Sequence, residues 1–238
     1  MTPPLKAMVM AAGLGTRMRP LSDRKPKALV EVAGRALIDH TLDRLLEAGV
    51  ETAVVNVHAF ADQMEAHLAG RGAPRILISD ERARLLETGG GIKQARPLLG
   101  EAPVFVANSD YVWTGEGEPL FRQLAARFDP ARMDALLTVV PKARTLGFDT
   151  PGDFFIDAAG ALTPRGEAAE APYHAFGLQV IDPSFAYAVA EEKFSLREVW
   201  FAMAARGRLF GLVPEGLWMQ VGDPEAVEVA ERALAARG

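Results

Sequence analysis

The sequence predicts a Rossmann-like α/β fold with three layers, in which helices cover both faces of a mixed, mainly parallel central sheet. Short apolar runs alternate with amphipathic segments through the first half of the chain. This alternation is typical of βαβ units, whose strands are buried on both faces. The chain has 238 residues, of which 49% are hydrophobic, and this suits one domain with a substantial core. We therefore expect a single domain over residues 1–238.

Five apolar runs in the first part of the chain predict strands, at residues 6–11, 52–57, 75–79, 102–108 and 134–140. Two segments between them, 37–49 and 60–70, carry apolar side chains at helical spacing and predict helices. A further helix is expected to begin near Gly91. Ligands of such sheets bind at the carboxyl ends of the strands. The segments that follow the first and fourth strands should therefore face each other.

The pattern changes after about residue 145. Residues 152–166 predict a hairpin with polar turns. Strands are expected at 173–181 and 208–214, and helices at 195–207 and 224–238. This half should complete the sheet and enclose a second pocket.

Composition excludes several classes of protein. The absence of cysteine excludes disulfides, thiol catalysis and cysteine-ligated metals. A net charge of −5 argues against a nucleic-acid partner, because such proteins usually carry a basic face. No apolar stretch approaches the roughly 20 residues that span a bilayer, and the N-terminus lacks the pattern of a signal peptide. We expect a cytoplasmic protein without a membrane partner.

A dense group of cations follows two glycines, Gly13 and Gly15, directly after the first predicted strand. Only one acid, Asp23, lies among them. In an acidic protein, one basic segment beside glycines suggests a small polyanionic ligand, with phosphates as the first candidates. The cations are Arg17, Arg19, Arg24, Lys25 and Lys27.

Three interpretations of this loop compete: a dinucleotide-binding turn, a cradle for the phosphates of a nucleoside triphosphate, or an ordinary basic surface loop. The dinucleotide fingerprint fails because Met18 occupies the position of its third glycine. Glycines let backbone N–H groups approach phosphate oxygens closely. Arg17 can bind phosphate with two parallel hydrogen bonds, and Lys27 can act as a point charge. The loop therefore favours a phosphate cradle.

Asp110 follows the fourth apolar strand, at the edge of the sheet where ligands are expected. An aspartate there suits Mg²⁺, a hard cation that prefers oxygen ligands. The alternative is an ordinary turn, since aspartate commonly forms turns.

The loop region reads MAAGLGTRMRPLSDRKPKALVEVAG (10–34) and closely resembles the signature of the sugar-1-phosphate nucleotidyltransferases, G-x-G-T-R followed by P-K. Blocks similar to those of this family follow in order: VVNVHAFADQMEAHL (54–68), LLETGGGI (85–92), VFVANSDYVW (104–113) and LWMQVGDPEAV (217–227). The LLETGGGI block and the short length most resemble the N-acetylmuramate 1-phosphate uridylyltransferases of peptidoglycan recycling. The resemblance implies the nucleotidyltransferase fold, with a nucleotide-binding half (1–145) and a sugar-binding half (146–238).

The resemblance also implies roles for individual residues. Arg17 and Lys27 would be catalytic, and Asn108 and Gly177 would contact the sugar. Glu87 would contact the loop or the ribose, or would only fix a turn. The implied nucleotide-binding residues are Ala11, Ala12, Gly13, Gly15, Thr16, Arg17, Lys27, Gly89 and Gly90.

The metal site departs from the family pattern. The resemblance implies Mg²⁺ on Asp110, with a second aspartate in the block W-x-D-V-G, but Gln220 stands at that second position. Asp223 is the candidate to replace it as a ligand. However, an aspartate before Pro224 also has the pattern of a helix N-cap, which the spacing favours.

The implied reaction moves UMP from UTP to a sugar 1-phosphate, N-acetyl-α-muramate 1-phosphate in the first place, and releases pyrophosphate. The partners would be a nucleoside triphosphate and a sugar 1-phosphate, acting on a monomer or homodimer. One alternative is a guanylyltransferase for mannose or heptose 1-phosphate. Another is a catalytically weak, nucleotide-binding regulatory homologue, for which Gln220 is the best argument.

Overall fold

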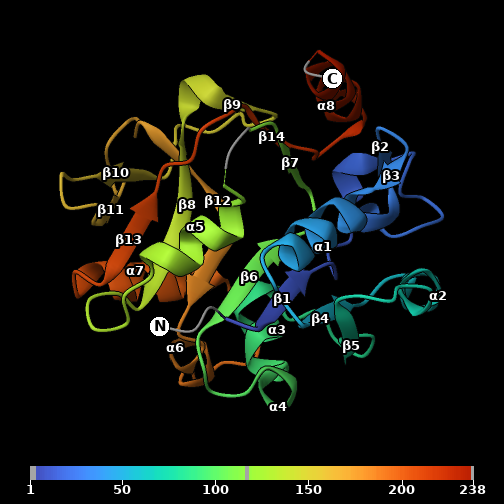
Figure 1. The fold of residues 1–238 in the computed structure, drawn as a ribbon, viewed down its shortest axis with the longest axis horizontal. Coiled ribbons are helices and arrows are strands. Elements are labelled where there is room, and N and C mark those ends of the chain that lie inside the picture. Colours follow the sequence, from blue (N-terminus) through green and yellow to red (C-terminus); the bar gives the residue numbers. More distant parts are fainter. Residues whose placement is uncertain (1–3, 116–117, 237–238) are drawn as a thin grey trace.

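The computed structural model describes residues 4–115 and 118–236, and it has helices on both faces of a central sheet (Figure 1). Four strands of the first half form a parallel block in the order β6-β1-β4-β5. The strands of this block are β1 (Lys6–Met10), β4 (Thr52–Val57), β5 (Arg75–Asp80) and β6 (Val104–Asn108).

The second half extends the same sheet. The long strand β12 (Tyr173–Ile181) runs antiparallel to β6 on one side and to β8 (Ala135–Pro141) on the other. β13 (Leu209–Leu212) runs parallel to β8, and the hairpin of β10 (Phe154–Ile156) and β11 (Leu162–Pro164) continues from β12. Within the described residues the sheet has nine strands. It is mixed and mainly parallel in its first half, which confirms the predicted fold class.

The two faces of the sheet bury two separate cores, because side chains alternate along each strand. Ala7 and Val9 of β1 face one core, and Met8 faces the other. The first core is covered by α1 (Leu37–Glu47), α2 (Ala61–Ala69) and α5 (Leu120–Arg127), and Figure 1 shows α1 and α5 in front of the sheet. The second is covered by α3 (Glu87–Gln94), α4 (Arg96–Leu99), α6 (Ser184–Tyr187) and α7 (Leu196–Ala205).

A third, smaller core lies beneath the glycine-rich loop. It joins Met18 to the C-terminal helix α8 (Pro224–Ala235), which packs beside the small hairpin of β2 (Glu31–Val32) and β3 (Arg35–Ala36) (Figure 1). Beside it lies a second sheet of β7 (Tyr111–Trp113), β14 (Trp218–Gln220) and β9 (Thr145–Leu146). Short 3₁₀ turns occur at Thr16–Met18, Lys27–Leu29 and Lys142–Arg144.

The long predicted elements are found within a few residues of their expected bounds, apart from the end of the last helix at 237–238, which lies outside the described residues. One start is wrong: α3 begins at Glu87 rather than near Gly91, so the glycines lie inside a helix. Close packing explains why this helix contains glycines. A Cβ on Gly89 would stand 2.2 Å from the Phe194 ring, and one on Gly90 would stand 2.2 Å from the Glu192 carbonyl oxygen. Within the described residues, no helix is long and apolar enough to cross a membrane.

Candidate active site

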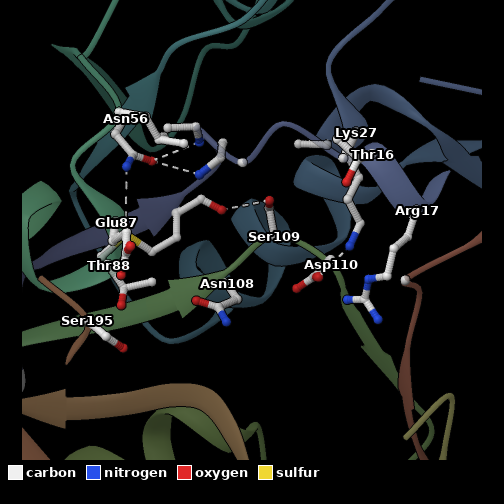
Figure 2. Close-up of a pocket in the computed structure, with 18 residues that line it drawn as sticks. Thr16, Arg17, Lys27, Asn56, Glu87, Thr88, Asn108, Ser109, Asp110 and Ser195 are labelled. Atoms are coloured by element: carbon white, nitrogen blue, oxygen red, sulfur yellow. Dashed lines mark hydrogen bonds and ion pairs between the residues drawn. The ribbon is translucent and has the colours of Figure 1, made fainter. Parts of the chain in front are cut away.

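A cavity of about 450 Å³ opens where β1, β4 and β6 end, between the glycine-rich loop and the start of α3. Figure 2 shows Thr16, Arg17, Lys27 and Asp110 at one end of it, and Asn56, Glu87, Thr88 and Ser195 at the other. The sheet thus brings together the two segments that the sequence predicted to face each other. The predicted site residues that line this cavity are Ala11, Ala12, Gly13, Gly15, Thr16, Arg17, Lys27, Asn108 and Asp110.

The glycine-rich loop is held in place by contacts with residues that follow it in the chain. Gly15 has φ +61°, a left-handed conformation that favours glycine, and an added Cβ would stand only 2.7 Å from Cβ of Lys27. The Ser22 hydroxyl donates to the Gly15 carbonyl oxygen at 2.7 Å. Met18, which takes the place of the third glycine in the dinucleotide fingerprint, is fully buried in the small core. The loop is therefore a closely packed turn that has Lys27 beside Gly15.

Lys27 and Asp110 form an ion pair at the centre of the charged end, with Nζ 2.6 Å from Oδ2 (Figure 2). Both side chains are largely shielded from water, at 15% and 19% exposure. A charge-assisted pair in such surroundings is short and strong. Arg17 is exposed and forms no ion pair with any other described residue. The cavity therefore offers one free guanidinium and one ammonium that can exchange its carboxylate partner for a ligand.

The donor set fits a metal ion that is shared with a bound phosphate group. Asp110 supplies carboxylate oxygens to the cavity, and Mg²⁺ is usually held by one or two carboxylates together with substrate phosphates. A cage made by the protein alone is not present in the part of the chain that the structure describes, where no three His, Asp or Glu side chains gather into a metal site.

The two candidate second ligands stand outside the cavity lining. Gln220 ends β14 and pairs in register with Tyr111. Asp223 caps α8, because its Oδ1 accepts a hydrogen bond from the Ala226 N–H at 2.9 Å. The geometry therefore gives Asp223 the N-cap role that its spacing favoured. Between them, Gly222 does line the cavity, and an added Cβ there would stand 3.5 Å from the Arg17 guanidinium.

Asn108 and Gly177 meet behind the cavity. Asn108 ends β6 and lines the cavity, whereas Gly177 lies in β12 at an irregularity in its pairing with β8. A Cβ on Gly177 would stand 2.3 Å from Nδ2 of Asn108, so this glycine makes room for the amide. Beside them, burial and the nearby Asp110 carboxylate raise the pKa of the Tyr111 hydroxyl above its usual range. Gly177 itself is not part of the cavity lining, and the contact with the sugar that the resemblance implies for it stays a prediction.

Gly89 and Gly90 also lie outside the lining of this cavity, and the contact with the nucleotide that the resemblance implies for them stays a prediction. Their N–H groups donate to the Phe194 carbonyl oxygen at 3.0 and 3.2 Å, which fastens α3 to the segment before α7. The residues just before them line the cavity instead: Leu85, Glu87 and Thr88. The sequence did not identify Leu85 or Thr88, because the local pattern does not show which side of a helix start faces a ligand.

The sequence also missed Asn56, a polar residue inside the apolar run of β4 that lines the cavity from behind. Its Oδ1 accepts hydrogen bonds from the N–H groups of Ala11 and Ala12 (Figure 2). A buried amide within an otherwise apolar strand was the available signal, since such groups are retained where they have hydrogen-bond partners.

A second cavity of about 470 Å³ lies beyond the end of β8, as expected for the second half of the chain. Its buried histidine, His174, contacts Thr145 Oγ1 at 2.9 Å and the Thr150 carbonyl oxygen at 3.2 Å, and stacks on the ring of Phe148. Both ring nitrogens are thus engaged in holding the loop that forms this cavity.

Comparison with known proteins agrees with this geometry. The family model described as Nucleotidyl transferase matches residues 6–148. The N-acetylmuramate alpha-1-phosphate uridylyltransferase of Caulobacter vibrioides is 53% identical over 236 residues, or 98% of each chain. The enzyme of that name from Neisseria meningitidis is 33% identical, over 92% of this chain and 93% of its own.

The fold is likewise similar to that of solved structures. A UDP-glucose pyrophosphorylase crystallised with UDP-glucose superposes with a TM-score of 0.79 and 15% identity, over 99% of this chain and 100% of its own. The family model covers more than half of the chain, and its matched residues 6–148 include the loop, Asn56, Asn108 and Asp110. The chain therefore belongs to the nucleotidyl transferase family.

Proposed function

We propose that the protein transfers UMP from UTP to a sugar 1-phosphate, N-acetyl-α-muramate 1-phosphate, and releases pyrophosphate. The observation that carries this proposal is the cavity in which the glycine-rich loop, Arg17 and the Lys27–Asp110 pair converge. The choice of base and sugar is supported by the high identity to the Caulobacter vibrioides uridylyltransferase over nearly the whole chain.

In the proposed reaction, an oxygen of the sugar phosphate attacks the α-phosphorus of UTP, and the bond from that phosphorus to the pyrophosphate oxygen breaks. The attacking oxygen already carries negative charge, so no general base is needed. Catalysis then consists of alignment and charge stabilisation. Arg17 and the N–H groups of the loop hold the triphosphate in line, and Lys27 turns from Asp110 toward the phosphate oxygens.

Asp110 would hold Mg²⁺ together with phosphate oxygens of the bound triphosphate. The metal, when bound, offsets the negative charge that develops on the departing pyrophosphate. Lys27 is displaced from the carboxylate at the same time, which leaves its ammonium group free for the substrate. One aspartate is enough in this arrangement because the triphosphate supplies the remaining anionic ligands.

We further propose that the two halves of the chain bind different parts of the substrates. Residues 1–145 supply most of the contacts to the nucleotide, with the base at the end of the cavity formed by Glu87 and Thr88, where Ser195 of the second half joins them, opposite the charged end. Residues 146–238 hold the sugar and support Asn108 through Gly177.

The test is pyrophosphate release with Mg²⁺, crossing UTP, GTP, dTTP and CTP with the 1-phosphates of N-acetylmuramate, N-acetylglucosamine, glucose and mannose. Turnover with UTP and N-acetylmuramate 1-phosphate supports the proposal. Preferred turnover with GTP and mannose 1-phosphate would favour the guanylyltransferase alternative. Nucleotide binding without turnover on any sugar would favour the regulatory homologue.

A further inference from the structure

A buried polar pair lies behind the cavity and has no part in the reaction proposed above. Asn56 of β4 is 3% exposed, and Glu81, the residue after β5, is 1% exposed. Asn56 Nδ2 donates to Glu81 Oε1 at 2.7 Å. Removing a carboxylate from water is costly unless it is hydrogen-bonded. A glutamate that is buried at this edge of the sheet is therefore expected to have a specific structural role.

The amide end of the pair holds one wall of the cavity. Asn56 Oδ1 accepts hydrogen bonds from the N–H groups of Ala11 at 2.7 Å and Ala12 at 3.2 Å, and Figure 2 shows both. These residues come directly after β1, where the chain leaves the sheet and its N–H groups lose their strand partners. At Gly13, the next residue, an added Cβ would have no other atom within 4 Å, so packing does not restrain the loop there. Asn56 therefore fixes the base of the glycine-rich loop.

The carboxylate end of the pair holds the opposite wall. Glu81 Oε2 accepts a hydrogen bond from the Leu86 N–H at 3.0 Å, at the point where α3 begins. The next residue, Glu87, lines the cavity with φ +63°, a conformation that non-glycine residues rarely adopt and that persists only when the surroundings enforce it. Both oxygens of Glu81 are thus used as acceptors, one for each neighbour.

Space for the pair is provided by Gly91 of α3. A Cβ there would stand 2.9 Å from Glu81 Oε1 and 3.1 Å from Asn56 Nδ2. Burial raises the pKa of the Glu81 carboxyl, and the hydrogen bonds from Asn56 and Leu86 oppose that rise. The helix, the pair and the loop are therefore packed as one unit behind the cavity.

We propose that Asn56 and Glu81 are positioning residues for the nucleotide. The pair links the Ala11–Ala12 backbone to the start of α3, and so sets the spacing between the two walls that enclose the ligand. Only the identity of the ligand in this inference rests on the proposed function. The backbone restraint is a property of the free protein and can be measured without any ligand.

The test exchanges the donor and the acceptor within the pair. Glu81→Gln brings an amide donor into a place where two donors already converge. Asn56→Asp brings a second carboxylate against Glu81. Each single variant should weaken UTP binding, measured by calorimetry, at least about tenfold. It should also speed amide hydrogen exchange at residues 11–12 and 86.

The double variant Asn56→Asp/Glu81→Gln restores a complementary pair. The new amide at position 81 can donate to the new carboxylate at position 56, while its oxygen accepts from Leu86. We expect UTP affinity and exchange rates to return to within about threefold of the wild type. A role in general stability alone would speed exchange across the whole chain in the single variants, whereas a positioning role predicts that faster exchange is confined to the neighbourhood of residues 11–12 and 86.

Ser79→Ala is the matched control. Ser79 is buried, lies on β5 in register with Asn56, and contacts neither wall of the cavity through its side chain in the described hydrogen bonds. This variant should leave affinity and exchange unchanged. Single variants that keep wild-type exchange at residues 11–12 and 86, or a folded double variant without recovery, would overturn the inference. A wild type that binds GTP but not UTP would correct the proposed function, and the exchange measurements would still decide the role of the pair.

Discussion

Replacing Gly177 with alanine should displace Asn108, the residue at the back of the cavity. The added Cβ would stand 2.3 Å from Nδ2, 2.5 Å from Cγ and 2.7 Å from Oδ1 of Asn108, and real contacts of a Cβ essentially never fall below 3.0 Å. The backbone of Gly177 is not in the left-handed region, so it can accept a side chain without conformational strain of its own. The steric conflict with Asn108 is therefore the dominant effect.

The expected cost follows from overpacking. Insertion of one carbon into a well-packed site costs roughly 1–3 kcal/mol. In a domain of this length each kcal/mol lowers Tm by about 2–4 °C, so Tm should fall by roughly 2–12 °C. Because Asn108 lines the cavity, kcat/KM with UTP and sugar 1-phosphate should fall at least about tenfold as its amide moves.

A double-mutant cycle isolates the cause. Asn108→Ala removes the three atoms that conflict, so Gly177→Ala should cost almost nothing further in that background, which gives a coupling of roughly 1–3 kcal/mol. Gly13→Ala is the control for thermal stability, because nothing lies within 4 Å of its added Cβ. The reasoning is refuted if Gly177→Ala keeps the wild-type Tm and kcat/KM, or if its effect simply adds to that of Asn108→Ala.

Three further predictions concern single residues. Lys27→Met should lower kcat by about 10²–10³-fold with little change in far-ultraviolet circular dichroism, because it removes the charge that stabilises the transition state in the proposed mechanism; near-normal turnover would remove Lys27 from that mechanism. Asp223→Ala should lower the free energy of unfolding by about 1 kcal/mol through loss of the α8 cap, with an unchanged Mg²⁺ titration of activity; a weakened Mg²⁺ response would instead identify a ligand. The pKa of Glu81 is raised by burial, so its ionisation opposes folding. Relative to Glu81→Gln, wild-type stability measured by urea unfolding should hold below pH 4.5 and decrease as the pH rises above it, and the opposite slope would contradict the burial argument.

The parts of this protein that could be predicted are those coded by local patterns. The runs at 52–57 and 173–181 match β4 and β12 residue for residue, because a strand between two helical layers is mostly apolar along its length. The glycine-rich loop and Asp110 were placed at one cavity because the carboxyl ends of parallel strands share an edge. The small strands β7 and β14 had no such pattern, and each is only three residues long.

The roles of individual glycines could not be read from the sequence. The resemblance implied ligand contacts for Gly89, Gly90 and Gly177. The structure adds that each makes room for a residue about 70 to 105 positions away, at Phe194, Glu192 and Asn108. A glycine shows that a side chain is excluded, but only the packing shows what occupies the space. Asp223 is the contrasting case, because its spacing favoured a helix cap and the structure shows the Ala226 N–H donating to its Oδ1.

The sequence by itself determined the layered α/β fold, the place of the glycine-rich loop and the aspartate at the end of β6, because periodicity and chain order specify strands and the edge at which they end. Only the tertiary structure decided that Asn56 and Glu81 join two walls of the cavity, and that Lys27 pairs with Asp110 across 83 positions of chain. Such contacts depend on the register and twist of strands distant in sequence, and short-range patterns do not carry that information.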